Sequence, residues 1–239
     1  MIHLIKNRMV LPLDIVEIPV LKVRFAPRIQ PRELNAFRGA VAAKVGLEYE
    51  WFHNHNNNKE NSSNYHYRYP LVQYKLMKGQ PGIFFLGQGV EEAMRLFVQP
   101  DWTLTFTRGQ KRVHLENMKR ESVHIGLSAQ KQHYRLRSWM AFNQTNYESY
   151  QKADSLIERL QLMERALVGH ILALANGLSY HFPERFSLAI TDLGQASTVT
   201  FSGNKMLAFD IAFQTDAVLP LGAGLGRGVG RGFGEVESV

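Results

Sequence analysis

The chain has 239 residues and a formal net charge of +7, from 28 Lys and Arg against 21 Asp and Glu. It contains no cysteine, which excludes disulfides, Cys-ligated zinc, iron–sulfur clusters and thiol nucleophiles. No apolar run is long enough to span a bilayer and the N-terminus lacks a signal-peptide pattern, so we expect a soluble, cytoplasmic protein. The basic excess favours an anionic partner, of which nucleic acid is the commonest.

The first half of the chain predicts alternating strands and helices. Residues 20–26 alternate between apolar and basic side chains, the pattern of a half-buried strand with a cationic solvent face. The other expected elements are a helix from Pro31 to Gly46, a polar surface loop at 53–64, strands at 69–77 and 83–86, a short helix at 91–97 and a strand at 103–108. This β-α-β-β-α-β order is typical of a ferredoxin-like (RRM-like) domain, an antiparallel sheet with two helices on one face.

The second half repeats part of this order. The expected elements are a strand at 134–142, a long amphipathic helix at 150–176 and strands at 186–191, 198–201 and 207–213. No second helix is found before the chain enters a glycine-rich C-terminal segment. We therefore expect an α+β fold of tandem ferredoxin-like βαββαβ halves, the second irregular, with domains at 1–115 and 130–239. A basic connection between Gly109 and Lys131 would join them.

The glycine-rich segment 222–234 has glycine at every second position, seven of the 19 in the chain. A dinucleotide-binding loop would need a long helix after it, and only five residues follow. A disordered Arg–Gly tail and an ordered loop that grips RNA both fit the composition. The spacing favours the loop, because Gly224-Leu225-Gly226 and Gly232-Phe233-Gly234 put an apolar anchor at each end of a cationic middle that carries Arg227 and Arg231.

This motif, at the end of a doubled ferredoxin-like chain, resembles the repeat-associated RNA-binding superfamily of CRISPR systems. More narrowly, the chain looks like the endoribonucleases that process CRISPR repeats in precursor crRNA. Three further segments resemble blocks of one branch of that family: Phe37-Arg38-Gly39-Ala40, residues 51–55 (WFHNH) and residues 67–75 (YRYPLVQYK). The resemblance implies a cut without metal or cofactor, in which the ribose 2′-OH attacks the scissile phosphate and leaves a 2′,3′-cyclic phosphate. Such a cut needs a base, an acid and cationic donors for the phosphorane.

The resemblance also implies the site residues. The family places its catalytic histidine after the first helix, which indicates His53 or His55 as the base, with the other histidine, Lys75 or Tyr49 assisting. The RNA-binding candidates are Gly224, Gly226, Arg227, Arg231, Gly232, Gly234, Arg135, Arg137 and Arg38, and Lys44 is expected to approach the cut with Arg38. The implied partner is CRISPR repeat RNA, with a CRISPR effector complex as a second candidate and no membrane; a monomer and a homodimer both remain open.

Competing interpretations follow from the same residues. A histidine in a polar loop is commonly solvated and without chemistry, and His170 in the long helix is expected to be a core or interface residue. The letters His53-Asn54-His55 do not make an HNH nuclease, whose residues come from separated parts of a ββα unit, and the pair lacks good additional zinc ligands, so no metal is expected. A non-catalytic RNA-binding subunit of an effector complex is the alternative function. A generic RNA-binding or ribosome-associated protein with a disordered tail is a third.

Overall fold

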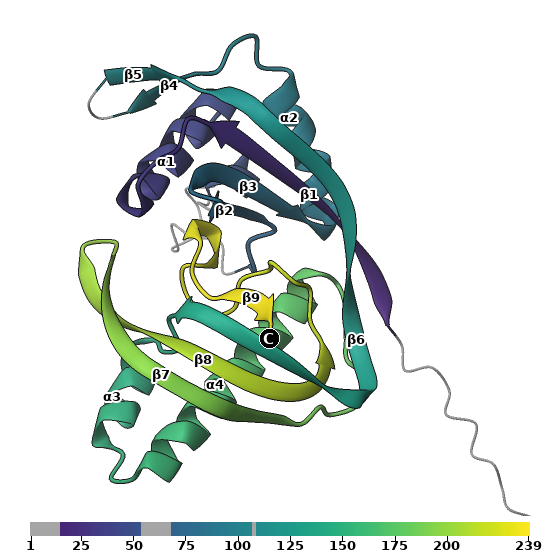
Figure 1. Ribbon diagram of the computed structural model, residues 1–239, viewed down its shortest axis with the longest axis vertical. Helices are drawn as coiled ribbons and strands as arrows, with labels where there is room; N and C mark the ends of the chain where they lie inside the picture. Colours follow the sequence, from purple (N-terminus) through teal and green to yellow (C-terminus); the bar gives the residue numbers. More distant parts are fainter. Residues whose placement is uncertain (1–14, 54–67, 107–108) are drawn as a thin grey trace, which may run out of the picture.

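Two groups of antiparallel strands meet at one long strand (Figure 1). The computed structural model describes residues 15–53, 68–106 and 109–239. The strands are β1 (Val16–Ala26), β2 (Val72–Met77), β3 (Gln80–Leu86), β4 (Thr103–Phe106), β5 (Gly109–Arg112), β6 (His114–Trp139), β7 (Leu188–Phe201), β8 (Asn204–Val218) and β9 (Glu235–Ser238). The helices are α1 (Leu34–Val45), α2 (Met94–Phe97), α3 (Gln144–Lys152) and α4 (Leu156–Gly177), with short 3-10 turns η1 (Pro31–Glu33), η2 (Glu50–Phe52), η3 (Gly87–Ala93) and η4 (Val229–Arg231).

Strand β6 has 26 residues and belongs to both groups. Its first part pairs antiparallel with β1, from His114–Ala26 to Ile125–Val16. In its second part, Tyr134 pairs with Phe213 of β8 on one edge and with Ser238 of β9 on the other. The basic segment between Gly109 and Lys131, where the sequence places the join of the two halves, is the short strand β5 followed by the first part of β6. Its residues from 114 to 120 are exposed, so the apolar alternation that marks a half-buried strand is missing there.

Both groups have the same strand order. It is β2-β3-β1-β6 in the first set and β7-β8-β6-β9 in the second. When the strands of each set are numbered along the chain, both orders are second, third, first, fourth, so the fourth strand lies beside the first. The fourth strand of the first set is β6 rather than the predicted 103–108, since β4 pairs only with β5 in a separate hairpin among the described residues. In the second set the predicted strands at 186–191 and 198–201 are one irregular strand, β7, and the four-residue β9 was not predicted.

Two hydrophobic cores hold the strand groups. Strand β1 serves both: Val23 and Phe25 pack with α1, whereas Ile18 and Val20 pack in the core that reaches α4. The predicted alternation in β1 is thus confirmed, and its basic side chains Lys22 and Arg24 form ion pairs with glutamates of β6. Of the stripe Leu156, Leu160, Met163, Leu167, Ile171 and Leu174 that the sequence predicts, helix α4 buries the last four against β6 and β8, whereas Leu156 is exposed. Within the described ranges, no helix has the length and apolar character of a membrane span.

Candidate nucleic-acid interface

The glycine-rich loop, residues 219–234, connects β8 to β9 in the place where the first strand set has η3 and α2. It lies between the two strand groups (Figure 1). The Gly224 N–H donates to Gln73 Oε1 at 3.1 Å, and the Tyr69 hydroxyl donates to the Gly224 carbonyl at 2.7 Å. Burial raises the pKa of Tyr69, so its hydroxyl stays a neutral donor. A loop that is tied to β2 in this way is not a disordered tail.

The loop closes on itself where the two glycine motifs meet. Leu225 N–H donates to the Gly234 carbonyl at 2.8 Å, and Gly234 N–H donates to the Arg137 carbonyl at 3.0 Å. Leu225 is fully buried, as expected of an anchor. Gly226 has φ +94° and Gly234 has φ +67°, and a Cβ on Gly234 would lie 1.9 Å from the Leu225 carbonyl oxygen. The backbone conformation of the loop therefore requires glycine at these two positions. Their role is to set the shape of the loop rather than to contact RNA.

A groove of about 490 Å3 brings the two halves of the chain together. From the first half it is lined by Arg38 of α1 and by His53, and from the glycine-rich loop by Arg227 and Arg231. These are four of the side chains that the sequence nominated, two from residues 38–53 and two from residues 227–231. The concentration of three guanidinium groups around one histidine suits a phosphodiester.

His53 is held firmly at the wall of this groove. It follows η2, whose Phe52 is buried in the core beneath, and it is only 7% exposed, so the interpretation as a solvated loop histidine is wrong. Its Nε2 lies 2.7 Å from the Leu47 carbonyl oxygen, and its own carbonyl accepts from the Arg38 guanidinium. Because a carbonyl can only accept, Nε2 carries the proton, and a neutral ring then has its basic lone pair on Nδ1.

Two of the other predicted catalytic residues, Tyr49 and Lys75, do not line the groove. Tyr49 lies under the Arg95 guanidinium, 4.4 Å from ring centroid to Cζ. Lys75 of β2 is 2% exposed and its Nζ lies 3.5 Å from Glu235 Oε2, an ion pair too poorly aligned to count as a hydrogen bond. Burial lowers the pKa of Lys75. His55 lies outside the described residues.

The remaining predicted RNA-binding arginines lie on the exposed side of β6. Arg135 and Arg137 alternate there with buried neighbours, and Arg137 Nε donates to Glu237 Oε2 of β9 at 2.8 Å. That hydrogen bond raises the pKa of Arg137. Neither side chain lines the groove, so both would meet RNA only beside it.

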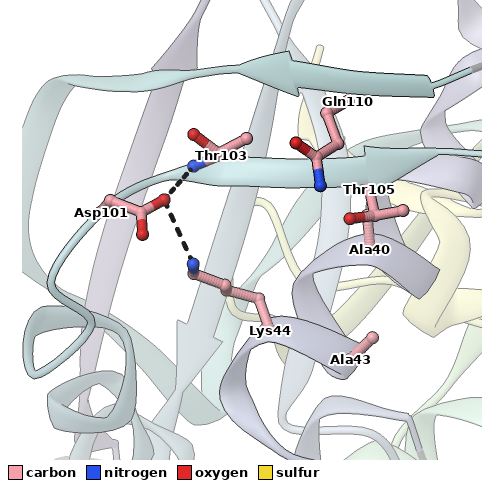
Figure 2. Close-up of a pocket in the computed structure, with 7 residues that line it drawn as sticks. All are labelled: Ala40, Ala43, Lys44, Asp101, Thr103, Thr105 and Gln110. Atoms are coloured by element: carbon pink, nitrogen blue, oxygen red, sulfur yellow. Dashed lines mark hydrogen bonds and ion pairs between the residues drawn. The ribbon is translucent and has the colours of Figure 1, made fainter.

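Lys44 does not approach the groove, contrary to expectation. Its Nζ lies 3.2 Å from Asp101 Oδ1, which also accepts from the Thr103 N–H at 2.7 Å (Figure 2). The pair lines a separate pocket of about 460 Å3 between α1 and the β4–β5 hairpin. Lys44 lies in the last turn of α1, six residues after Arg38, and this spacing turns its side chain about 120° around the helix axis from that of Arg38, toward a different site.

Sequence reasoning missed one wall of the groove, the tip of the β7–β8 hairpin. Arg231 Nη1 donates to Ser202 Oγ at 2.9 Å, and its Cζ lies 4.6 Å from the Phe201 ring centroid. Asn204 and Met206 also line this wall. No motif marks these residues, because only the pairing of two long strands brings the hairpin tip to the loop. In the described part of the chain, no three His, Asp or Glu side chains gather as metal ligands do.

Solved structures share this architecture. A crystal structure of Cas6b is 26% identical to this chain, with a TM-score of 0.80 over 94% of it and 100% of the compared chain. A crystal structure of the CRISPR RNA processing endoribonuclease Cas6b is 25% identical, with a TM-score of 0.68 over the same shares. The fold is thus that of the CRISPR RNA-processing endoribonucleases.

Sequence comparison specifies the family. The family of Cas6b N-terminal domains matches residues 16–124, and that of Cas6b C-terminal domains matches residues 126–239. An uncharacterised protein of Methanocaldococcus jannaschii is 33% identical over 101 residues, which are 42% of this chain and 67% of that protein. The chain belongs to the Cas6b family of CRISPR RNA-processing endoribonucleases, which confirms the resemblance seen in its sequence.

Proposed function

We propose that this chain cuts CRISPR precursor RNA within its repeats, without a metal ion, by attack of a ribose 2′-OH on the adjacent phosphate. The observation that supports this proposal is the groove in which His53 and Arg38 face Arg227 and Arg231. A new bond forms between the 2′-oxygen and phosphorus, and the bond from phosphorus to the 5′-oxygen breaks. The products are a 2′,3′-cyclic phosphate and a 5′-OH.

The side chains divide this work by their chemistry. His53 or His55 takes the proton of the 2′-OH, and the other histidine, Tyr49 or Lys75 assists or returns a proton to the 5′-oxygen. His53 has the stronger structural support, because it lines the groove and its ring is oriented by the Leu47 carbonyl. The guanidinium groups of the groove stabilise the added negative charge of the phosphorane.

The strand orders support an interpretation as two ferredoxin-like units. In each, four strands lie in the order fourth, first, third, second, which is the order of that fold. The proposed division into domains at 1–115 and 130–239 then needs one qualification: β6 is both the last strand of the first unit and the first strand of the second. The glycine-rich loop is the proposed RNA-gripping element of the second unit.

The proposed substrate and partner is CRISPR repeat RNA, bound mainly through its phosphates. The test is incubation with the repeat RNA of the encoding organism in EDTA, with the products resolved on a denaturing gel. We expect one cut, blocked when the nucleotide 5′ of the scissile phosphate carries a 2′-deoxyribose. Persistence of the cut in the deoxy substrate would exclude attack by the 2′-OH.

Histidine variants test the site. We expect His53→Ala or His55→Ala to lower the single-turnover rate at least about 100-fold while RNA binding survives. His181→Ala, an exposed histidine after α4 that lies outside the groove, is the matched control and should cut normally. Unchanged cutting by both His53→Ala and His55→Ala would remove this assignment. Binding by the wild type without any cut would instead support the alternative, a non-catalytic subunit of an effector complex.

A further inference from the structure

Two more hollows continue from the groove along the second half of the chain. The near hollow, about 520 Å3, shares Asn204, Met206 and Arg227 with the groove. The far hollow, about 490 Å3, shares Phe142, Asn143 and Arg227 with the near one. Arg227 therefore stands where all three meet. We call the near and far hollows together the α3–α4 trough.

The lining of the trough suits an anion. The described residues that line it include Arg165, Lys205 and Arg227 and no Asp or Glu. In the described part of the chain, no acidic side chain pairs with Arg165 or Arg227. Arg137, by contrast, pairs with Glu237. Two unneutralised guanidinium groups in one trough indicate a site for an anionic ligand.

His170 gives the far hollow a neutral donor. The indole N–H of Trp139 donates to His170 Nδ1 at 3.3 Å. An indole can only donate, so the imidazole must carry its own proton on Nε2. Burial, and secondarily the nearby Arg227, lowers the pKa of His170 to about 4, which keeps the ring neutral at physiological pH. The imidazole is thus a fixed N–H donor beside the cationic groups of the far hollow.

The same contacts tie the trough to the glycine-rich loop. The Arg227 N–H donates to the Met140 carbonyl at 3.1 Å, and a Cβ on Gly226 would lie 2.8 Å from the Trp139 ring. Tyr147 of α3 lines the near hollow and offers an aromatic face. Alternating cationic and aromatic groups along a trough are typical of surfaces that track a single-stranded nucleic acid.

We propose that the α3–α4 trough binds the sugar–phosphate backbone of a single-stranded RNA segment that flanks the cut. This inference rests on the proposed function and adds the path that the RNA follows outside the groove. The strand leaves the groove at Arg227, passes Lys205 and Tyr147 in the near hollow, and reaches Arg165 and His170 in the far one.

The test compares arginines on one helix. Arg165→Ala removes one of the two arginines that line the far hollow, and Arg159→Ala removes an exposed arginine of α4 outside the trough. We expect Arg165→Ala to weaken binding of the full repeat RNA about 3- to 10-fold and to lower the log–log salt slope by about 0.7, while Arg159→Ala changes neither. Both side chains are exposed, so neither substitution should impair folding.

Shortened RNAs make the test specific to position. The repeat RNA is trimmed one nucleotide at a time from its 5′ end in one series and from its 3′ end in another. In one of the two series, the effect of Arg165→Ala on affinity should vanish first. The effect of Lys205→Ala should vanish only after further trimming, because Lys205 lies nearer the groove. Fluorescence anisotropy at fixed salt gives each affinity.

Each result has a distinct meaning. If Arg165→Ala binds every RNA as the wild type does, or if Arg159→Ala weakens binding equally, the trough is not the path, although cutting by the wild type would leave the proposed function intact. Loss of the Lys205 effect before the Arg165 effect would reverse the assigned order and overturn the path. A wild type that neither binds nor cuts the full repeat would overturn the proposed function and this inference with it.

Discussion

Gly234→Ala should destabilise the glycine-rich loop at the point where it meets β9. The residue has φ +67°, which an alanine adopts at a cost of about 1–2 kcal/mol. Its new Cβ would lie 1.9 Å from the Leu225 carbonyl oxygen, which is backbone and cannot turn aside. Movement of either backbone segment would break the hydrogen bonds that Gly234 makes with Leu225 and Arg137.

The two costs add to a measurable loss of stability. Overpacking of a well-packed site costs about 1–3 kcal/mol, so the free energy of unfolding should fall by about 2–5 kcal/mol in total. For a chain of this size each kcal/mol lowers the melting temperature by about 2–4 °C, which predicts a fall of about 4–20 °C. RNA affinity should fall as well, because the loop positions Arg227 and Arg231.

Gly230→Ala is the matched control in the same loop. Its φ is not positive and its Cβ would lie 3.6 Å from the nearest atom, in the Pro70 ring. We expect its unfolding free energy to stay within about 0.5 kcal/mol of the wild type. Thermal unfolding followed by circular dichroism gives both values. Equal melting temperatures for Gly234→Ala and Gly230→Ala would refute the argument that backbone geometry requires Gly234.

Two other predictions concern the cations of the site. The double variant Arg227→Ala with Arg231→Ala should weaken RNA binding and lower the log–log salt slope by about 1.4, measured by anisotropy; an unchanged slope would show that neither arginine meets phosphate. Lys75→Met should be about 1 kcal/mol more stable near neutral pH, because it removes a buried charge whose partner Glu235 remains partly hydrated. Burial lowers the pKa of Lys75 in the folded protein below its ordinary 10.5. Between these two pKa values the unfolded chain binds more protons than the folded one, so wild-type stability rises with pH in that range. The free energy of unfolding of Lys75→Met, measured in urea, should lack this rise with pH. Parallel pH profiles of the wild type and the variant would contradict the argument. Loss of RNA cutting in a stable variant would support an assisting role for Lys75.

The parts of the fold that the sequence predicted are those with one buried face. Strand β1 alternates because its side chains divide between two environments, and the stripe of α4 repeats every three or four residues because it packs on a sheet. The start of β6 could not be predicted in the same way. Its residues from 114 to 120 are exposed and show no apolar alternation, although Arg24 of the paired strand β1 forms an ion pair with Glu116 there.

The sequence likewise predicted only part of the candidate site. The resemblance found His53, Arg38 and the loop arginines because motifs carry them, and the structure brings these side chains to one groove. It also nominated Lys75, whose side chain faces the interior and Glu235. Whether a polar residue of a strand faces a groove or a core depends on the elements packed against it. Lys75 meets Glu235 of β9, a strand of four residues in the other group that local pattern does not predict.

The glycine-rich loop explains how two halves share one site. In the first strand set, η3 and α2 connect the third strand to the fourth, and in the second set the loop takes that place. A helix with its side chains is about 10–12 Å across and would hold the second half away from β2. At Gly232 a Cβ would lie only 3.0 Å from the Tyr74 carbonyl oxygen, so the glycine backbone packs directly against the backbone of β2. That close approach places Arg227 and Arg231, carried by the second half, across the groove from His53 of the first.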